Sequence, residues 1–304
     1  MSQPVRVIAL MNQKGGVGKT TTTVNLAAAI ARKGRNTLVI DLDPQAHASL
    51  HLGVGAEGAP PKSTVYDVLL DEQSDPRASI HTVNEHLAVL PAETDLAGLE
   101  ADLAGVADAQ KRLDRAITRL GGEYEFVLLD CPPSLGILTI NGLTAAREVL
   151  IPMQAHFLAL QGVGKLLETV KLVSSRVNPR LRVLGIALCM HDPSSTHVRE
   201  VVADLESFFE AARAPGAPDT PWKLARVLRP AIRRNIKLAE CPSFGQSIFD
   251  YAPDAPGAQD YANLAEPLIR EWDALMAKRA QLAADASPTT PTTSAAAASI
   301  PGSV

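Results

Sequence analysis

A loop rich in lysine and glycine near the start of the chain carries the residues best suited to chemistry. Between a short apolar run and a long stretch of helical spacing, the chain reads Asn12-Gln13-Lys14-Gly15-Gly16-Val17-Gly18-Lys19-Thr20-Thr21. Glycines let successive backbone N–H groups point at phosphate oxygens, and the start of the following helix adds its positive end. The loop therefore predicts a phosphate site in which Lys19 reaches the β- and γ-phosphates of a nucleotide and Thr20 ligates Mg²⁺.

The loop departs from the usual phosphate-binding pattern. That pattern, G-x-x-x-x-G-K-[ST], requires glycine at position 13. This chain has Gln13 there and a second lysine, Lys14, directly after it. We expect nucleotide contacts along the whole loop, from Lys14, Gly15, Gly16, Val17, Gly18, Lys19, Thr20 and Thr21.

Two apolar runs end in carboxylates of the kind that a phosphate-transfer site requires. They are LVIDLDPQ (38–45) and FVLLD (126–130). Asp130 has the form of a carboxylate that holds Mg²⁺, often through water. Of Asp41 and Asp43, one is suited to support the loop and the metal shell, and the other to orient an attacking water. Strands often end in Asp as a turn or cap, so the prediction depends on the order of the three motifs.

Short runs of Val, Ile and Leu alternate with longer stretches of helical spacing. The expected strands are 5–11, 37–42, 87–90, 126–129, 148–152 and 183–189, and the expected helices are 20–31, 110–120, 160–177, 198–211 and 261–283. Strands that are apolar on both faces and alternate with helices predict an α/β fold, with a mostly parallel central β-sheet flanked by helices on both faces. Ligands of such sheets lie at the carboxyl ends of the strands, where all three motifs fall.

Composition and cysteine usage narrow the class of protein. The 304 residues are 46% hydrophobic and 20% charged, which excludes a collagen-like or wholly disordered chain. Three separated cysteines without a CxxC pair favour a reducing compartment over a metal cage. The net charge of −4 requires any nucleic-acid binding to use a local basic patch. No apolar run approaches the roughly 20 residues of a membrane span, so we expect a cytoplasmic protein.

The assembled motifs resemble the ParA/Soj family of deviant Walker A ATPases, within the larger group of P-loop NTPases that includes MinD and the nitrogenase iron protein. The resemblance covers about residues 5–270. It is carried by KGGVGKTTT (14–22), VNLA (24–27), DLDPQ (41–45), LLDCPPSLG (128–136), LTINGL (138–143), IPMQ (151–154), ALQG (159–162) and IRRNIKLAECPSFG (232–245).

This resemblance implies a Mg-ATP-dependent partition ATPase that acts as an ATP-bound sandwich homodimer. Lys14 would be the signature lysine that reaches the other subunit's phosphates and acts in catalysis with Lys19 and Asp43. Asp43 matches the residue that positions the hydrolytic water, and Asp41 the supporting carboxylate. Thr20 and Asp130 match the magnesium shell. The nucleotide base is expected near Met190, Ile232 and Asn235.

The stretch between residues 223 and 237 indicates what such a dimer engages. It holds six cations and no acid before Glu240: Lys223, Arg226, Arg229, Arg233, Arg234 and Lys237. Pro230 prevents one continuous helix, so we expect a strand–loop–helix surface. A solvated basic face is the ordinary interpretation, but six cations in an acidic chain favour sequence-independent contact with DNA phosphates. The resemblance agrees and adds a ParB/Spo0J-type centromere-binding partner, with the protein on the nucleoid.

Other members of the group supply the alternatives. A MinD-like membrane ATPase needs a basic amphipathic C-terminal helix, whereas 261–283 mixes both signs of charge, so we expect no membrane partner. A reductase of the nitrogenase iron protein type needs cysteines at a dimer face. Cys131 directly follows Asp130, where a small buried cysteine usually only packs, and Cys189 lies within an expected strand. An amide-forming ligase would need a second substrate site.

Departures from the family pattern affect details of the site. His156 and Gln161 stand where acidic residues are common, Arg233 stands where IPRN has proline, and the region after Asp192 lacks a frequent arginine. We expect one P-loop ATPase domain over residues 1–283. Residues 284–304, made of Ala, Ser, Thr and Pro with few large apolar groups, are expected to be disordered.

Overall fold

The computed structural model describes residues 4–55 and 61–285. The chain divides into two compact units, Met1–Pro267 and Leu268–Val304, and the functional motifs all lie in the first. The expected tail lies almost wholly outside the described residues, because the last of these is Asp285. The predicted division at residue 283 therefore stays a prediction.

An eight-stranded sheet forms the centre of the first unit, with the order β3-β4-β2-β5-β1-β6-β7-β8. Every pairing is parallel except that of β3 with β4. The strands are β1 (Arg6–Leu10), β2 (Thr37–Asp41), β3 (His81–Asn84), β4 (Leu87–Leu90), β5 (Phe126–Asp130), β6 (Glu148–Met153), β7 (Arg182–Leu188) and β8 (Arg226–Leu228).

The helices connect these strands in the manner of a doubly wound α/β fold. They are α1 (Lys19–Ala31), α2 (His47–His51), α3 (Val65–Leu70), α4 (Leu99–Asp102), α5 (Arg112–Arg119), α6 (Ile137–Ala145), α7 (Phe157–Arg176), α8 (Thr196–Arg213), α9 (Lys237–Glu240), α10 (Ile248–Tyr251) and α11 (Pro256–Asp285). Helix α11 begins in the first unit and ends in the second.

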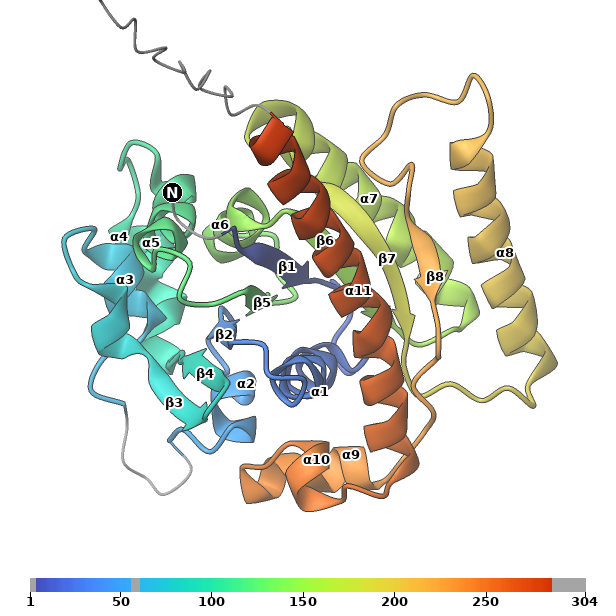
Figure 1. The fold of residues 1–304 in the computed structure, drawn as a ribbon, viewed down its shortest axis with the longest axis horizontal. Helices are drawn as coiled ribbons and strands as arrows, with labels where there is room; N and C mark the ends of the chain where they lie inside the picture. Colours follow the sequence, from blue (N-terminus) through green and yellow to red (C-terminus); the bar gives the residue numbers. More distant parts are fainter. Residues whose placement is uncertain (1–3, 56–60, 286–304) are drawn as a thin grey trace, which may run out of the picture. The chain divides into compact units, whose positions relative to one another are not determined.

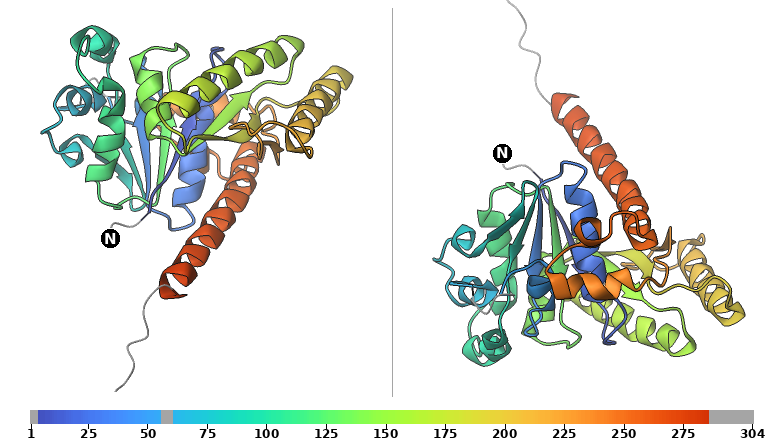
Figure 2. Two further views of the ribbon diagram at one scale, coloured as in Figure 1. Left: turned by 90° about the horizontal axis from the view of Figure 1, so that it is seen from above. Right: turned by 90° about the horizontal axis from the view of Figure 1, so that it is seen from below.

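Alternate residues of the central strands face opposite layers of helices. Val7 and Ala9 of β1 belong to a core shared with α3 and with α5 to α8, whereas Ile8 and Leu10 face the other side. Helix α1 packs on that second side, across β2, β5 and β1. Views along the sheet show α1 (blue) on one face and the teal and green helices on the other (Figures 1 and 2). This burial of both faces explains why the strands read as continuous apolar runs.

All six strands and the α/β class predicted from the sequence are confirmed. Strands β3 and β8 were not predicted from the sequence. β3 is a polar strand whose residues alternate between half-buried and exposed, so it lacks the apolar run that marked the others. β8 has only three residues. The expected strand–loop–helix path of 223–237 is formed by β8, a loop and α9.

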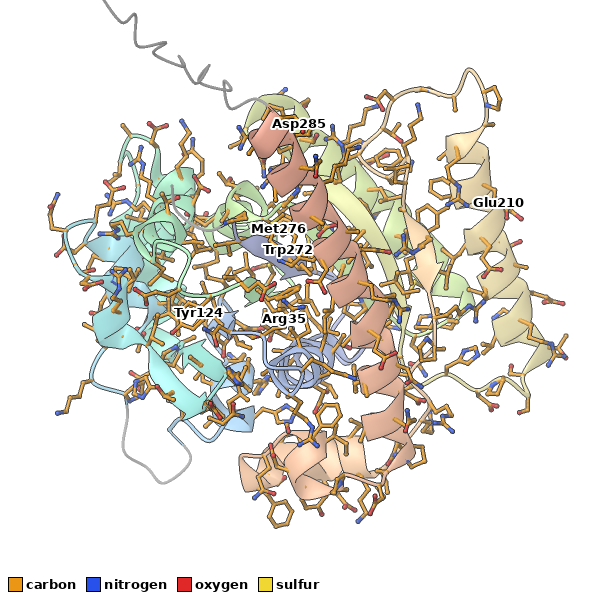
Figure 3. All side chains as sticks on the ribbon, viewed as in Figure 1. Arg35, Tyr124, Glu210, Trp272, Met276 and Asp285 are labelled. Carbon is orange, nitrogen blue, oxygen red and sulfur yellow. The ribbon has the colours of Figure 1, made fainter. Side chains whose placement is uncertain are left out.

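Charged side chains cover the outer faces of the helices (Figure 3). Glu210 is an example, exposed on the side of α8 away from the sheet. Among the described residues, no helix is long and apolar enough to cross a membrane.

Helix α2 packs closely against the turn that follows α9. Gly53 and Gly245 both have positive φ, of 81° and 63°, and a Cβ built on Gly245 would lie 2.9 Å from the Cα of Gly53. The same contact buries His51, with 1% of its surface exposed and its Nε2 3.4 Å from Sγ of Cys241. Burial lowers the pKa of His51 to about 4, so this imidazole is neutral in the folded protein at neutral pH.

This burial predicts that the protein loses stability as the pH falls from 6.5 toward 4. The unfolded state takes up a proton at His51 near its ordinary pKa, whereas the folded state takes it up only near pH 4. Between pH 7.5 and pH 5, this one group lowers the free energy of unfolding by about 2 kcal/mol. Urea unfolding at the two pH values should show a smaller difference for His51→Gln than for the unsubstituted protein. An identical difference would contradict the assignment.

Candidate nucleotide-binding site

The predicted phosphate loop joins the carboxyl end of β1 to the first turn of α1. Gly16 and Gly18 adopt φ values of 72° and 88°. These angles curl the backbone, and residues other than glycine rarely adopt them. Asn12 supports the loop: its Nδ2 donates to the carbonyl of Pro152 at 2.8 Å, and its Oδ1 accepts from the N–H of Lys14 at 3.0 Å. The loop is thus tied to the end of β6.

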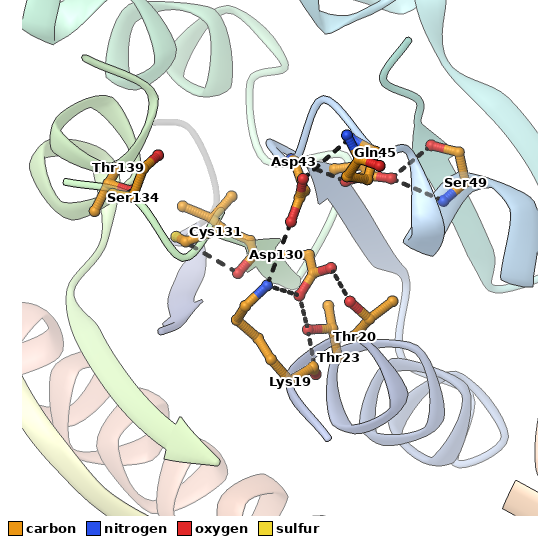
Figure 4. A network of polar contacts seen from close by, with 12 residues as sticks. Lys19, Thr20, Thr23, Asp43, Gln45, Ser49, Asp130, Cys131, Ser134 and Thr139 are labelled. Atoms are coloured by element: carbon orange, nitrogen blue, oxygen red, sulfur yellow. Dashed lines mark hydrogen bonds and ion pairs between the residues drawn. The ribbon is translucent and has the colours of Figure 1, made fainter. Parts of the chain in front are cut away.

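Lys19 lies inside a cluster of carboxylates at the carboxyl ends of adjacent strands (Figure 4). Its Nζ is 3.6 Å from Oδ2 of Asp43 and 3.9 Å from Oδ1 of Asp130, and its side chain is only 9% exposed. A buried ammonium requires such partners, because an unpaired charge out of water is strongly disfavoured. The structure therefore brings together the lysine and two of the carboxylates that the sequence singled out.

Asp130 has three cationic or hydroxyl partners on α1. Its Oδ2 accepts from Oγ1 of Thr20 at 2.7 Å, and its Oδ1 accepts from Oγ1 of Thr23 at 2.8 Å, beside Lys19. Asp130 is fully buried, and this burial raises its pKa against the opposing effect of the Lys19 charge. The loop sequence drew attention to Thr20 but not to Thr23, although residues three apart share one face of a helix.

Thr20 and Asp130 fit a magnesium ion by their chemistry and closeness. Both supply hard oxygen atoms, and the hydroxyl and carboxylate oxygens are 2.7 Å apart. Mg²⁺ in nucleotide sites is usually held by one or two protein oxygens together with phosphates and waters. Within the described residues no group of three or more His, Cys, Asp or Glu could hold a metal by itself.

Asp41 and Asp43, though only two residues apart, serve different partners. Asp41 is fully buried and accepts the N–H and Oγ of Ser49, at 2.9 and 2.8 Å, and the N–H of Asp43 at 3.1 Å. Burial, with a contribution from the Asp130 charge, raises the pKa of Asp41 to about 7. Asp41 thus holds the turn that presents Asp43 to Lys19. Ser49 in turn holds Asp41, and this role of Ser49 was not predicted from the sequence.

The second lysine of the loop points away from the cluster. Lys14 is exposed, and its Nζ lies 2.6 Å from Nε2 of His156, at the beginning of α7. His156 is one of the departures noted in the sequence, and it is a side-chain neighbour of Lys14. The side chain of Gln161, the other departure here, lies outside the described residues.

A cavity of about 560 Å³ opens beside the loop, and it contains the three residues expected near the base. Met190, Ile232 and Asn235 line it together with Gly16, Gly18, Thr21, Cys189 and Tyr261. Met190 has a φ of 50° two residues after the end of β7, so the chain turns sharply at the wall of the cavity. Phosphate loop and cavity are continuous through the two shared glycines, as one nucleotide site requires.

The basic stretch is less free than its sequence suggests. Carboxylates pair with three of its cations. Two come from distant segments, Glu206 with Arg229 at 2.7 Å and Asp260 with Arg233 at 2.7 Å, and the third is local, Glu240 with Lys237 at 2.8 Å. The count of six cations without an acid was correct for the sequence. Folding brings in acidic residues from α8 and α11, which no local sequence pattern indicates. Arg229, Arg233, Arg234 and Lys237 are nevertheless exposed, and Lys223 and Arg226 are half-buried.

The cysteines are packing residues. Cys131 and Cys189 are buried, and burial raises their pKa values to about 12 and about 11. A protonated, enclosed thiol is a poor metal ligand and a poor nucleophile. Sγ of Cys189 lies 3.3 Å from where a Cβ on Gly18 would lie, so the thiol fills the space behind the loop.

Comparisons with known proteins agree with this geometry. Residues 5–183 match the AAA domain family. The chain is 39% identical over 275 residues to the chromosome partitioning protein ParA of Caulobacter vibrioides (strain NA1000 / CB15N), covering 90% of this chain and 97% of that protein. It is 44% identical over 265 residues to the chromosome-partitioning ATPase Soj of Thermus thermophilus, covering 87% and 96%.

Solved structures show the same architecture. A cobyrinic acid a,c-diamide synthase from Mycobacterium smegmatis, with bound ADP and magnesium, has 37% identity and a TM-score of 0.72, covering 89% of this chain and 96% of that one. Sheet order, phosphate loop and carboxylate cluster together define a P-loop ATPase of the deviant Walker A type. Within that class the chain belongs to the ParA/Soj family.

The buried cluster predicts that Lys19→Ala weakens Mg-ATP binding by more than about tenfold. The change removes the cation that faces Asp43 and Asp130, and the negative charge that remains repels the phosphates. Calorimetric titration with Mg-ATP measures the effect, and thermal melting checks the fold. Lys33→Ala is the matched control, because Lys33 is half-exposed near the other end of α1, 3.1 Å from Glu266. Equal affinity of Lys19→Ala and Lys33→Ala would contradict this role.

Proposed function

We propose that this protein is a Mg-ATP-dependent partition ATPase whose ATP-bound homodimer binds DNA without sequence preference. One observation carries the proposal: the loop has two lysines with opposite surroundings. Lys19 is enclosed with Asp43 and Asp130, whereas Lys14 is exposed at the rim with His156 beside it. One lysine suits the phosphates of its own subunit, and the other suits those of a second subunit. The partition names of the similar proteins support the same activity.

The residues of the site divide the work of hydrolysis among them. Lys19 and the loop N–H groups hold the phosphates, and Thr20 and Asp130 hold Mg²⁺, which neutralises charge on the phosphoryl oxygens. Asp43 lies at the edge of the cluster, fixed by Asp41 and its own turn, and orients the attacking water. Lys14 of a second subunit stabilises charge at the transferring phosphoryl group, as an arginine finger does. Hydrolysis is therefore slow until a dimer forms.

Release from DNA follows hydrolysis. A ParB/Spo0J-type protein bound at a centromere-like site stimulates the ATPase and returns the dimer to monomers. Repeated cycles of DNA binding and release then move a chromosome or plasmid, and the protein is found on the nucleoid. The names of the similar proteins support this cycle.

The exposed position of Lys14 predicts that Lys14→Ala binds ATP but remains monomeric. Its side chain makes no contact with Asp43 or Asp130, so its loss leaves the pocket for the phosphates of the same subunit intact. Light scattering with ATP measures the mass, and calorimetric titration measures ATP affinity. The natural control is Lys19→Ala, in which binding itself fails. An ATP-dependent dimer of Lys14→Ala would contradict the trans role.

The exposed cations predict that Arg234→Ala combined with Lys237→Ala weakens DNA binding by the ATP-bound protein. Each lost phosphate contact lowers the slope of log affinity against log salt by about one unit. Fluorescence anisotropy of a labelled duplex, at several salt concentrations, measures both quantities. Arg182→Ala and Lys33→Ala serve as charge-matched controls outside this stretch. An unchanged salt slope in the double variant would exclude this surface.

A second candidate function is ATP-dependent amide formation. The observation that favours it is the name of the solved structure from M. smegmatis. The proteins that carry partition names are 39% and 44% identical and cover nearly the same length, so we place partition first. Phosphate release that depends on glutamine or ammonia and on a carboxylate substrate would favour the ligase. Phosphate release stimulated by DNA and a centromere-binding protein would favour partition.

A further inference from the structure

The loop after β8 continues the sheet at the wall of the base cavity. The N–H of Ile232 donates to the carbonyl of Leu188 at 2.7 Å, and the N–H of His191 donates to the carbonyl of Ile232 at 2.9 Å. These bonds attach residue 232 to the carboxyl end of β7. Arg233 still forms an isolated parallel bridge with His191, but residues 233–235 belong to no strand, and Asn235 lines the cavity. A further interaction fixes this part of the wall.

Arg233 provides that interaction through Asp260 at the start of α11. Its backbone N–H donates to Oδ2 at 3.0 Å, its Nε donates to both carboxylate oxygens at 3.0 and 3.1 Å, and its Nη2 donates to Oδ1 at 2.7 Å. Nη2 also donates to the carbonyl of Pro256 at 3.3 Å. Asp260 is only 4% exposed, and its hydrogen bonds to the Arg233 guanidinium, together with its charge, raise the pKa of that guanidinium. A forked pair of charge-assisted bonds is strong and directional.

The residue after Asp260 belongs to the cavity itself. Tyr261 is 1% exposed and lines the cavity, and its hydroxyl lies 3.1 Å from Oγ1 of Thr22 on α1. Thr22 in turn lies 3.3 Å from Sγ of Cys189, which stands behind Gly18. One turn of α11 therefore holds the 232–235 loop with Asp260 and the phosphate-loop helix with Tyr261.

We propose that Arg233 and Asp260 are positioning residues for the nucleotide base, and that Arg233 acts on the base wall and not as a DNA phosphate contact. The pair fixes the backbone of 233–235, so Asn235 and Ile232 keep the spacing that a base requires. Arg234, next in the chain, is also exposed and lines the same cavity, but it is not part of this pair, so it remains the DNA-facing member of the two. The inference rests on the proposed function in one respect, that the cavity beside the phosphate loop takes the base of ATP.

The test compares a ligand that has a base with one that lacks it. Isothermal titration with Mg-ATP and with Mg-tripolyphosphate gives the ratio of their dissociation constants, which measures what the nucleoside adds. Arg233→Ala and Asp260→Asn should each reduce this ratio by about tenfold, since each removes charge-assisted bonds that hold the wall. Affinity for tripolyphosphate should not change, because the phosphate loop is not involved.

Arg229→Ala is the matched control and should keep the ratio of the unsubstituted protein, because Arg229 is an exposed arginine of the same stretch that pairs with Glu206 and does not line the cavity. The double variant Arg233→Ala/Asp260→Asn should lose no more than either single variant, because both changes break the same pair. Arg233→Lys, which keeps the charge but loses the fork, should fall between. Asp260→Asn also tests the pair if the Arg233→Ala protein does not fold because its buried Asp260 carboxylate has lost its partner.

Two results would overturn the proposal: an unchanged ratio in both Arg233→Ala and Asp260→Asn, or an equal loss of ATP and tripolyphosphate affinity. Both are distinct from failure of the proposed function. A protein that binds ATP but never DNA would refute partition and leave the ratio measurable. A second readout is the salt slope of DNA binding, which Arg233→Ala should leave unchanged at saturating ATP and Arg234→Ala should lower.

Discussion

The enclosed ammonium group of Lys19 is the interaction on which the rest of the site depends. A charge in the interior must be paired, and here it is shared between Asp43 and Asp130 at 3.6 and 3.9 Å. The carboxylates follow β2 and β5, and the lysine follows β1 through the phosphate loop. These three strands are neighbours in the order β2-β5-β1, so the parallel sheet itself places the groups at one edge.

The balance of charge at this edge explains why the site requires further cations. Asp43 and Asp130 face a single enclosed lysine, Asp41 is buried beside Asp130 on the neighbouring strand, and burial raises the pKa values of Asp41 and Asp130. A triphosphate adds still more negative charge. In the proposed mechanism, Mg²⁺ at Thr20 and Asp130 and Lys14 of a second subunit supply the cations that restore this balance. Under that proposal, a site that is short of positive charge in the monomer couples nucleotide binding to dimer formation.

The sequence predicted the parts of the molecule that are encoded locally. Apolar runs defined six of the eight strands, and the loop with its two strand-terminal carboxylates defined the site, because each motif is contiguous. Contacts between distant segments were not predictable in this way. Ser49, which holds Asp41, and Asp260, which holds Arg233, stand 8 and 27 residues from their partners and carry no local pattern.

The basic stretch likewise depends on contacts between distant segments that the sequence does not predict. Its cations were correctly counted, but Glu206 and Asp260 approach it only after folding. Arg233 was predicted as a DNA contact because of its charge, and its four bonds to Asp260 give it a different neighbour. The departure from proline at this position thereby acquires a physical role, since a tethered arginine restrains the loop where a proline ring would.

The most direct test of the account is binding to a non-specific DNA duplex without nucleotide, with ADP and with ATP. Asp43→Ala is expected to hold the ATP state, because it removes the carboxylate proposed to orient the water while Lys19 still faces Asp130. The account predicts that the protein binds DNA only in the presence of ATP. The affinity should fall by roughly tenfold or more as salt rises from low to physiological concentration. Equal binding in all three states, or no binding by a verified ATP dimer, would contradict it.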